Sequence, residues 1–251
     1  MSPTTVFISG ANRGIGRGIA EIYLSRPNHI IIAGARDPNH PSAQSLKTLP
    51  VAEGTKLIVV KLESASDTDA AAAVETIKAA GVDHLDIVIA NAGISGGHGK
   101  VHEIDLAWFR EAFEVNTLGK LKLYQAAYPL LQETGAGAKF VAISTLAATT
   151  TDVEKLVFFP IGAYAATKAA VNHLTRKAHY DNEWLTSFAI HPGFVQSDMG
   201  NEGARAFGLA EATDPLDTSC AAIVKVIDEA SRDSIAGTHG FLNNDGTTIP
   251  W

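Results

Sequence analysis

Tyr164 and Lys168 are the two residues whose types and spacing most directly suggest chemistry. In a helix, side chains four residues apart lie on the same face, one turn above each other. A phenol ordinarily loses its proton near pH ~10, and an ammonium group within several ångströms lowers that pKa by favouring the phenolate. Such a pair can pass a proton to or from an oxygen as a general acid or base. The alternative is that both residues lie on the side of an ordinary amphipathic helix. The pair indicates catalysis only if the rest of the chain builds a cofactor site in front of it.

Composition limits the classes of protein that this chain can belong to. Its 251 residues, 46% hydrophobic and 19% charged, suit a water-soluble α/β chain with a large core. The formal net charge is -7 and Lys and Arg do not cluster, so we expect no nucleic-acid partner and no anionic membrane. No apolar run approaches the ~20 residues of a membrane span, and the N-terminus lacks the basic start of a signal peptide. We expect a cytoplasmic protein.

Two further observations concern redox chemistry and metals. The single cysteine, Cys220, excludes an internal disulfide and fits a reducing compartment. Its apolar neighbours indicate a small buried hydrophobe rather than a nucleophile. His98 and His102 share a glycine-rich loop, but no cluster of Cys or acidic residues accompanies them. We therefore expect no metal site.

A glycine-rich turn follows the first apolar run of the chain, Val6–Ile8, and opens a helix that stops before Pro27. Gly10, Gly14 and Gly16 lie in this turn. A strand, a glycine turn and a helix in that order are the context in which glycines bind a dinucleotide. Glycines let a pyrophosphate approach the backbone, and the helix N-terminus offers it unpaired N–H groups and partial positive charge. A plain β–α turn is the alternative, but the flanking elements favour a cofactor site.

The residues after the second strand, Ile30–Ala35, indicate which nicotinamide cofactor binds. The residue after this strand usually faces the adenosine ribose, where an acid binds a free 2′-hydroxyl and an arginine accommodates a 2′-phosphate. Arg36 comes first here, with Asp37 one step later, and Arg13 of the glycine turn can reach the same side. This pattern favours NADP(H) over NAD(H), unless Arg36 is only solvated or Asp37 turns in to bind the ribose.

Alternating strands and helices predict a doubly wound α/β fold. Such alternation gives a mainly parallel sheet with helices on both faces, and right-handed crossovers place ligands at the carboxyl ends of the strands. Further strands are predicted at Lys56–Val60, Leu85–Ala90, Lys139–Ile143, Ser187–Ile190 and Phe241–Leu242. Further helices are predicted over Ser42–Leu49, after an N-cap at Ser66, and over Asp105–Glu133 and Ala163–Asp181. No linker is visible, so one domain over residues 1–251 is expected.

Acidic and small residues follow two of these strands at the edge where a ligand would bind. Leu62 and Glu63 follow the third strand, where an acid could hydrogen-bond the adenine amine. The fourth strand ends in Asn91, Ala92 and Gly93, whose small side chains would let the backbone pass close to the cofactor ribose.

Together these stretches resemble the short-chain dehydrogenase/reductase family over essentially the whole chain. The matching motifs, in order, are Ser9–Gly16 (SGANRGIG), Asn91-Ala92-Gly93, Asn116, Ser144-Thr145, Tyr164 with Lys168, and Pro192-Gly193. Within the family, the chain looks most like the fungal norsolorinic-acid-ketoreductase-like group, whose members act on aromatic polyketides or are uncharacterised. The segments that carry this second likeness are Val6–Glu21, Arg36–Pro41, Leu85–Gly93 and Pro250-Trp251. The resemblance implies a Rossmann fold with a seven-stranded sheet.

The resemblance also implies a mechanism. Tyr164 would be the acid in carbonyl reduction and the base in alcohol oxidation, while Lys168 lowers its pKa and holds the nicotinamide ribose. Asn116 would help position a water that connects Lys168 to solvent. A hydroxyl at the end of the fifth strand would bind the substrate oxygen, and by position this is Thr145, where the family usually has a serine. Threonine keeps the donor but adds a methyl group. Ser144 would take the role if the strand end is shifted.

The motifs and the resemblance imply two sets of binding residues. Expected cofactor contacts are Gly10, Asn12, Arg13, Gly14, Ile15, Gly16, Arg36, Leu62, Glu63, Asn91, Ala92, Gly93, Tyr164, Lys168, Pro192, Gly193, Val195 and Ser197. Residues 194–214 would form a mobile lid, and residues 149–160 an extended loop at the pocket mouth. An apolar pocket for a flat or bulky ketone would be lined by Phe158, Phe159, Phe194, Met199 and Phe207. For about half of these, an ordinary core position is the alternative.

We therefore expect an NADPH-dependent carbonyl reductase, reversible as an alcohol dehydrogenase, with a small-molecule substrate. One alternative is a non-catalytic NADP(H)-binding sensor on the same fold, favoured only by Thr145. The other is a secondary-alcohol dehydrogenase that uses NAD. The family commonly pairs subunits through its two long helices, and the alanines of Ala163–Asp181 suit close packing against a second copy. The resemblance is thus compatible with a homodimer or homotetramer, although monomers exist in the family and the sequence does not fix the subunit count.

Overall fold

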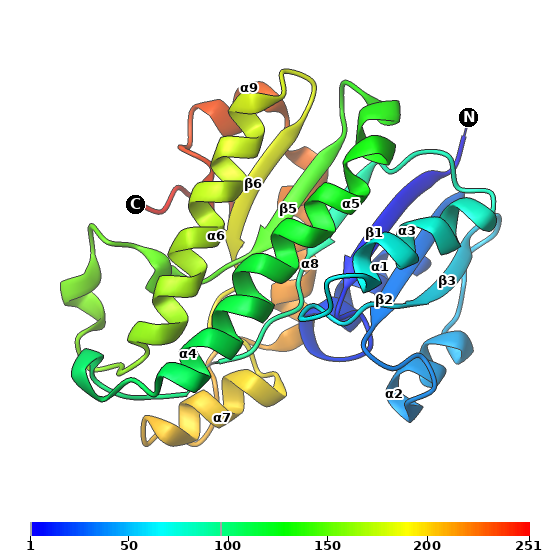
Figure 1. Ribbon diagram of the computed structural model, residues 1–251. Coiled ribbons are helices and arrows are strands. Elements are labelled where there is room, and N and C mark those ends of the chain that lie inside the picture. The colour runs from blue at the N-terminus through cyan, green and yellow to red at the C-terminus, as the bar shows by residue number, and fades with distance from the viewer. Residues whose placement is uncertain (1, 96) are drawn as a thin grey trace.

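A seven-stranded sheet lies between two layers of helices in the computed structural model, which describes residues 2–95 and 97–251 (Figure 1). The strands are β1 Thr4–Ser9, β2 His29–Ala35, β3 Lys56–Lys61, β4 Ile87–Ala90, β5 Lys139–Ile143, β6 Thr186–His191 and β7 Phe241–Asn243. Neighbouring strands pair in parallel in the order β3-β2-β1-β4-β5-β6-β7. Each predicted strand is present, and the predicted doubly wound Rossmann fold is confirmed.

Helices connect the strands and cover both faces of the sheet. The α-helices are α1 Gly14–Leu24, α2 Pro41–Gln44, α3 Asp69–Ala79, α4 Leu106–Phe113, α5 Gly119–Thr134, α6 Gly162–Asp181, α7 Asp198–Ala206, α8 Leu216–Glu229 and α9 Arg232–Ala236. Short 3-10 turns are η1 Ser45–Thr48, η2 Val101–Glu103, η4 Leu146–Ala148 and η5 Val153–Leu156, and η3 Glu114–Leu118 is a π-turn. Within the described residues, none of these helices has the length and apolar character to span a membrane.

Alternation along the strands divides the core into two layers. Val6 and Ile8 of β1 face the side covered by α1 and α8, whereas Phe7 faces the side covered by α3 and α5. Successive side chains of a strand point to opposite faces, so each buried strand contributes to both layers. In Figure 1, α5 and α6 lie in front of the sheet and α8 behind it. Because the strands are parallel, all their carboxyl ends meet at one edge, where ligands bind in folds of this kind.

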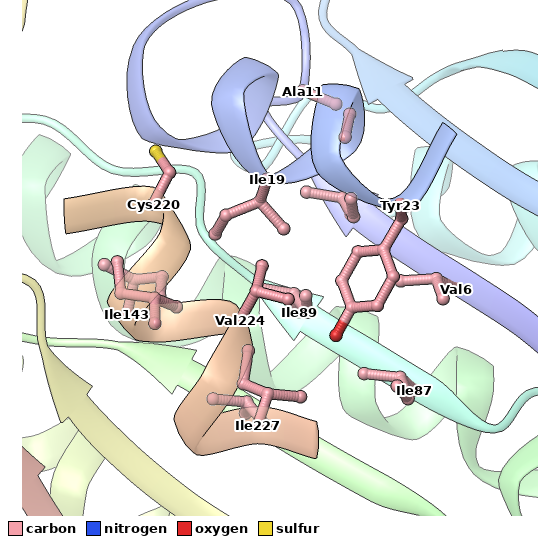
Figure 2. Packing of buried hydrophobic residues seen from close by; sticks show 14 of the residues in the cluster. Val6, Ala11, Ile19, Tyr23, Ile87, Ile89, Ile143, Cys220, Val224 and Ile227 are labelled. Carbon is pink, nitrogen blue, oxygen red and sulfur yellow. The ribbon is translucent and has the colours of Figure 1, made fainter. Parts of the chain in front are cut away.

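The layer between α1, α8 and the sheet is closely packed. Figure 2 shows Ile19 and Tyr23 of α1 against Val224 of α8, over the strand residues beneath them. Cys220 lies in the same layer and is buried, and burial raises the pKa of its thiol to about 12. The prediction of a small buried hydrophobe at Cys220 is therefore confirmed. This layer holds the glycine turn, at the start of α1, rigidly against the sheet.

The structure corrects the long helix predicted over Asp105–Glu133. Helices α4 and α5 are separated there by the π-turn Glu114–Leu118. A π-turn inserts one extra residue into the helical spiral and is found frequently at functional sites. Asn116 lies in this turn, and its side chain is wholly buried. Apolar periodicity does not reveal the turn, because the buried face continues across it.

The start of α3 and the helices near the C-terminal end also differ from prediction. Helix α3 begins at Asp69, and Thr68 rather than Ser66 is its N-cap position. Ser66 is in a turn before the helix, where its hydroxyl accepts a hydrogen bond from the Asp69 N–H at 3.2 Å and donates to Asp69 Oδ1 at 2.8 Å. Helices α7, α8 and α9 were not predicted. The spacing of Cys220, Ile223, Val224 and Ile227 is helical and would have indicated α8.

Candidate active site

The glycine turn between β1 and α1 forms a backbone cradle at the carboxyl edge of the sheet. Gly10 and Gly14 have positive φ angles of 65° and 53°, which other residues rarely adopt. A Cβ on Gly16 would overlap the carbonyl oxygen of Gly10 and lie 2.5 Å from Asn91 Nδ2. Asn91 donates from Nδ2 to the carbonyl oxygens of Ser9 and Gly10 at 3.0 and 3.2 Å. The turn is therefore fixed directly against the end of β4.

Helix α1 directs its N-terminus into this cradle. Arg13, its N-cap residue, makes no side-chain hydrogen bond to the helix, and the first turn contains no acidic residue. The backbone N–H groups of Gly14, Ile15 and Gly16 belong to this first turn, where N–H groups have no acceptor within the helix. Such N–H groups and the positive end of the helix dipole attract an anion. These residues fit the pyrophosphate of a dinucleotide.

Arg36 and Asp37 follow β2 at the same edge and have different surroundings. The Arg36 side chain is 79% exposed, and its Nε lies 3.6 Å from Glu63 Oε2. Glu63, predicted beside the adenine, thus lies beside Arg36 in this structure. The Asp37 carboxylate accepts a hydrogen bond from the Asn39 N–H at 2.8 Å, so it is engaged in its own loop. Both side chains are exposed at the end of β2, but one oxygen of the Asp37 carboxylate is already bonded within its own loop.

Three other predicted cofactor residues near the carboxyl edge of the sheet make contacts within the protein. Arg13 forms an exposed ion pair with Asp198 of α7 at 3.3 Å. Exposed pairs of this kind contribute only about 0–1 kcal/mol, so a phosphate can displace the carboxylate. Asn12 donates from Nδ2 to Ser42 Oγ at 2.7 Å. Leu62 is buried in the core against α3, so its side chain is structural.

Helix α6 places Tyr164 and Lys168 on one face, as predicted. Lys168 Nζ lies 5.4 Å from the centre of the Tyr164 ring. It donates a hydrogen bond to the carbonyl oxygen of Ile143, the last residue of β5, at 3.0 Å. Lys168 is only 3% exposed, and Tyr164 is half-buried. The pair therefore lies at the carboxyl edge of the sheet, where the glycine cradle also lies.

Burial shifts the pKa values of both groups. It lowers the pKa of Lys168 to about 8 and raises the pKa of Tyr164 to about 12. The prediction that Lys168 lowers the pKa of Tyr164 is therefore wrong for the protein chain by itself. Burial is the cause of the raised pKa of Tyr164, because removal from water disfavours the charged phenolate. At neutral pH the phenol keeps its proton, which is the form that can donate it.

Asn116 joins the loop after β4 to α6. Its Nδ2 donates to the carbonyl oxygen of Ile94 at 2.9 Å and to Thr167 Oγ1 at 3.0 Å, and its Oδ1 accepts from the Ile94 N–H at 2.8 Å. A Cβ on Gly93 would lie 3.0 Å from Asn116 Oδ1 and 3.4 Å from Lys168 Nζ. The structure thus brings together Gly93 from the loop after β4, Asn116 from the π-turn and Lys168 from α6.

The two hydroxyl groups after β5 have different environments. Ser144 is buried, and its Oγ donates to Asn172 Oδ1 on α6 at 2.6 Å. Its N–H donates to the carbonyl oxygen of Ile190, so pairing with β6 continues through Ser144. Thr145 is half-buried, and its Oγ1 accepts a hydrogen bond from the Ala147 N–H at 3.3 Å. That bond leaves the hydroxyl hydrogen of Thr145 available to another acceptor.

Three of the predicted substrate residues gather between α7 and the loop before α6. The rings of Phe159 and Phe207 lie 4.8 Å apart, edge to face, and His98 lies 5.4 Å from Phe207. Phe194 and Phe207 both lie beside Gly203 of α7, because a Cβ there would be 3.9 and 3.8 Å from their rings. Segments far apart in the sequence thus meet through aromatic rings.

The other two predicted substrate residues lie at the surface. Phe158 is 87% exposed and Met199 is 39% exposed, so neither is buried against this aromatic group. His102 lies 3.5 Å from Glu103 on the surface. In residues 2–95 and 97–251, no three His, Cys, Asp or Glu side chains gather in a way that could hold a metal ion.

Asp214 fastens both ends of the predicted lid segment, residues 194–214. Its Oδ2 accepts a hydrogen bond from the Phe194 N–H at 2.6 Å, and its backbone pairs with that of the buried Val195. Gly193 has a φ of 94°, and a Cβ there would overlap the Asp214 carboxylate. Ser197 caps α7 by accepting a hydrogen bond from the Gly200 N–H at 3.1 Å.

Pro192 connects this segment to the core. Its carbonyl oxygen accepts hydrogen bonds from Ser219 Oγ at 2.6 Å and from Asn244 Nδ2 at 2.9 Å. These contacts fix both ends of residues 194–214 to the rest of the fold.

Lys120 is a further buried residue of this region, and it belongs to none of the sequence motifs described above. It lies on α5 and is 4% exposed, and its Nζ donates a hydrogen bond to the carbonyl oxygen of Ala90. Its position four residues after Asn116, on the same face of the predicted helix, could have indicated that Lys120 is buried.

The pKa of Lys168 predicts a pH-dependent stability. Its pKa is about 8 in the folded chain against an ordinary 10.5, so the unfolded chain binds more protons between these values and stability rises with pH there. Without nucleotide, Lys168→Met should be more stable than wild type at pH 7, by up to about 3 kcal/mol. Urea unfolding should show this difference shrinking between pH 8 and pH 10. A constant difference would contradict the shift. Tyr164, whose pKa is raised, affects stability only above pH ~10.

Sequence comparisons place the chain among known proteins. The short chain dehydrogenase family matches residues 4–206. The chain is 43% identical over 250 residues to a norsolorinic acid ketoreductase of Dothistroma septosporum, with 99% of this chain and 92% of that protein covered. It is also 43% identical over 251 residues to a short-chain dehydrogenase of Neurospora crassa, with 99% and 98% covered.

The fold is similar to that of a solved reductase. The NADPH-bound carbonyl reductase from chicken fatty liver superposes with a TM-score of 0.84 at 29% identity, covering 100% of this chain and 95% of that one. Together with the sequence matches, this confirms the predicted resemblance to the family and to its norsolorinic acid ketoreductase members. The chain belongs to the short-chain dehydrogenase family and is an oxidoreductase.

Proposed function

We propose that the protein is an NADPH-dependent carbonyl reductase that converts a small-molecule ketone or aldehyde to an alcohol. The observation that carries this proposal is that the half-buried Tyr164 and the buried Lys168 lie together at the edge that also holds the glycine cradle. Relatives named as ketoreductases and a carbonyl reductase of the same fold support it. A sensor that only binds the cofactor would not need a phenol held beside a buried amine.

The residues have separate roles in the proposed reaction. A bound nicotinamide cofactor supplies the hydride. Tyr164, which keeps its proton at neutral pH, gives that proton to the substrate oxygen. Lys168 is mostly protonated below its pKa of about 8, so its ammonium stabilises the phenolate that remains. Asn116 holds the loop that follows β4 against helix α6 through its hydrogen bonds to both. The Thr145 hydroxyl, whose hydrogen is available, donates to the substrate oxygen.

The cofactor preference follows from the charges at the end of β2. The exposed Arg36 and the weakly paired Arg13 offer two guanidinium groups to a 2′-phosphate. Asp37, the acid that could have bound a free 2′-hydroxyl, is engaged with the Asn39 N–H. NADPH is therefore proposed over NADH.

The substrate class follows from the aromatic rings beside α7. Phe159, Phe194 and Phe207 would present ring faces and edges to a flat or bulky ketone, and residues 194–214 would close over it as a lid. An aromatic, polyketide-like ketone is the substrate we propose, in line with the relatives named norsolorinic acid ketoreductase. A homodimer or homotetramer and a cytoplasmic location stay predictions.

Tyr164→Phe should separate catalysis from cofactor binding. The substitution removes the acidic hydroxyl and keeps the ring, so NADPH affinity should stay within about twofold, while turnover falls by about 10²–10⁴-fold. NADPH oxidation would be followed by absorbance over a panel of aromatic ketones, aliphatic ketones and quinones. Tyr180→Phe, on the exposed side of the same helix, is the matched control. Full turnover by Tyr164→Phe would refute the proposed acid.

Paired substitutions should identify the hydroxyl that binds the substrate oxygen. Thr145→Val should lower kcat by about 10²–10³-fold with little change in stability, because it removes a donor to the developing charge. Ser144→Ala should lower the free energy of unfolding by about 1–3 kcal/mol, because it leaves the Asn172 amide oxygen without its donor. The opposite assignment of effects would show that Ser144 is the catalytic hydroxyl.

Arg36→Ala should change the cofactor preference. Loss of a charge-assisted contact to the 2′-phosphate should raise the Kd for NADPH by about 10–100-fold and leave the Kd for NADH almost unchanged. Titration by nucleotide fluorescence measures both values, with Arg110→Ala, an exposed arginine on α4, as control. Equal weakening of both cofactors would exclude a 2′-phosphate site at Arg36.

A further inference from the structure

Lys120 brings a second amine to the buried edge where Lys168 lies. Its side chain is 4% exposed, and its Nζ donates to the carbonyl oxygen of Ala90. Among the described residues, no carboxylate pairs with it. Lysine is almost never fully buried without a partner, because desolvating its charge costs free energy. The free-energy cost of burying Lys120 without a carboxylate therefore suggests that its amine has a chemical role.

The two amines, on α5 and α6, bond to the ends of two neighbouring strands. Lys120 bonds to the carbonyl oxygen of Ala90, the last residue of β4, and Lys168 to that of Ile143, the last residue of β5. Ala90 pairs in register with Ala142, directly before Ile143. Neighbouring strands lie about 4.8 Å apart. The two carbonyl oxygens therefore hold the amines close enough for the charge of Lys168 to act on Lys120.

A groove between α5 and α6 leads from the surface to Lys120. It has a volume of about 140 Å³, and Lys120, Thr117 and Thr175 are among the residues that line it. Lys177 and Asp181 also line it and are exposed, so they mark its open side. This groove lies apart from the glycine cradle and from the aromatic rings beside α7.

The charged groups around Lys120 favour its neutral form. Burial, and then the charge of Lys168, lower the pKa of Lys120 well below its ordinary value. Lys177 and Asp181 form an ion pair with each other, and Tyr124 has a pKa raised to about 12 by burial, so it is neutral. An ammonium group can only donate hydrogen bonds, whereas a neutral amine can donate one and accept another. A neutral Lys120 can therefore take up a proton on one side as it releases one on the other.

We propose that Lys120 is a positioning residue that passes protons from the α5–α6 groove to Lys168. The inference rests on the proposed function, in which Tyr164 gives its proton to the substrate oxygen. The phenolate then takes a proton from the Lys168 ammonium. Lys120 takes a proton on its lone pair from water in the groove, which leaves hydroxide there, and the resulting ammonium passes a proton to the neutral Lys168 amine. Each step moves one proton, and electrons move only with the hydride.

The kinetic test compares wild type with Lys120→Met and Lys120→Ala. In single-turnover reduction, both variants should be slowed by at least about tenfold, with a larger solvent isotope effect in D₂O and an unchanged Kd for NADPH. Added ethylamine should restore part of the rate of Lys120→Ala, because it can occupy the space of the missing amine. Lys177→Met, which removes the exposed lysine of the same groove, should leave the rate unchanged. An unaltered rate and isotope effect in a folded Lys120→Met would overturn the proposal.

A titration that needs no turnover tests the same proposal. In NMR spectra of selectively labelled lysine, Lys168 should respond to two titration steps in wild type and to one in Lys120→Met, because the charge of Lys120 acts on it. A single step in both proteins would overturn the coupling, even if Tyr164→Phe behaves as a reductase variant should. If wild type reduces no carbonyl compound, the proposed function fails, whereas the titration still decides whether the two amines interact.

Discussion

Burial of an amine at the carboxyl edge of the sheet is the constraint on which the rest of the site depends. Lys168 is nearly inaccessible to water, yet its Nζ is satisfied by the carbonyl oxygen that ends β5. A buried ammonium is tolerated only where hydrogen bonds and nearby charge compensate for lost solvation. The position of α6, and with it the position of Tyr164, is therefore tied to the place where β5 ends. Parallel strands bring that place to the same edge as the glycine cradle.

The π-turn, Gly93 and Lys120 lie around Lys168 and help to position it. The π-turn directs Asn116 inward, where it bonds both the loop after β4 and α6. Gly93 leaves room for the backbone to pass against Asn116 and Lys168. Lys120, one turn further along, occupies the end of β4 as Lys168 occupies the end of β5. A stable fold alone would not require two lysines in its interior, since apolar residues of similar size would cost less to bury.

The fold could be predicted from sequence to a large extent, and the site in part. The strands were recognisable because runs such as Ile30–Ala35 are continuously apolar, as strands buried on both faces must be. Tyr164 and Lys168 were recognisable from helical spacing alone. The π-turn was not, because it changes backbone hydrogen bonding without changing the residue pattern. The direction of the Tyr164 pKa shift was also wrong, because spacing reveals a neighbouring charge but not the depth of burial. Lys120 was missed because its burial depends on how α5 packs on β4.

The most direct test of the account is the fate of a label carried by the cofactor. NADPH carrying deuterium at both hydrogen positions of the nicotinamide C4 would be mixed with the protein and an aromatic ketone, and the alcohol product would be examined by mass spectrometry and NMR. If hydride and proton meet at the edge where Tyr164 and Lys168 lie, one deuterium should appear on the carbinol carbon in wild type and almost none in Tyr164→Phe over the same time. An alcohol without deuterium, or equal transfer by both proteins, would contradict the account.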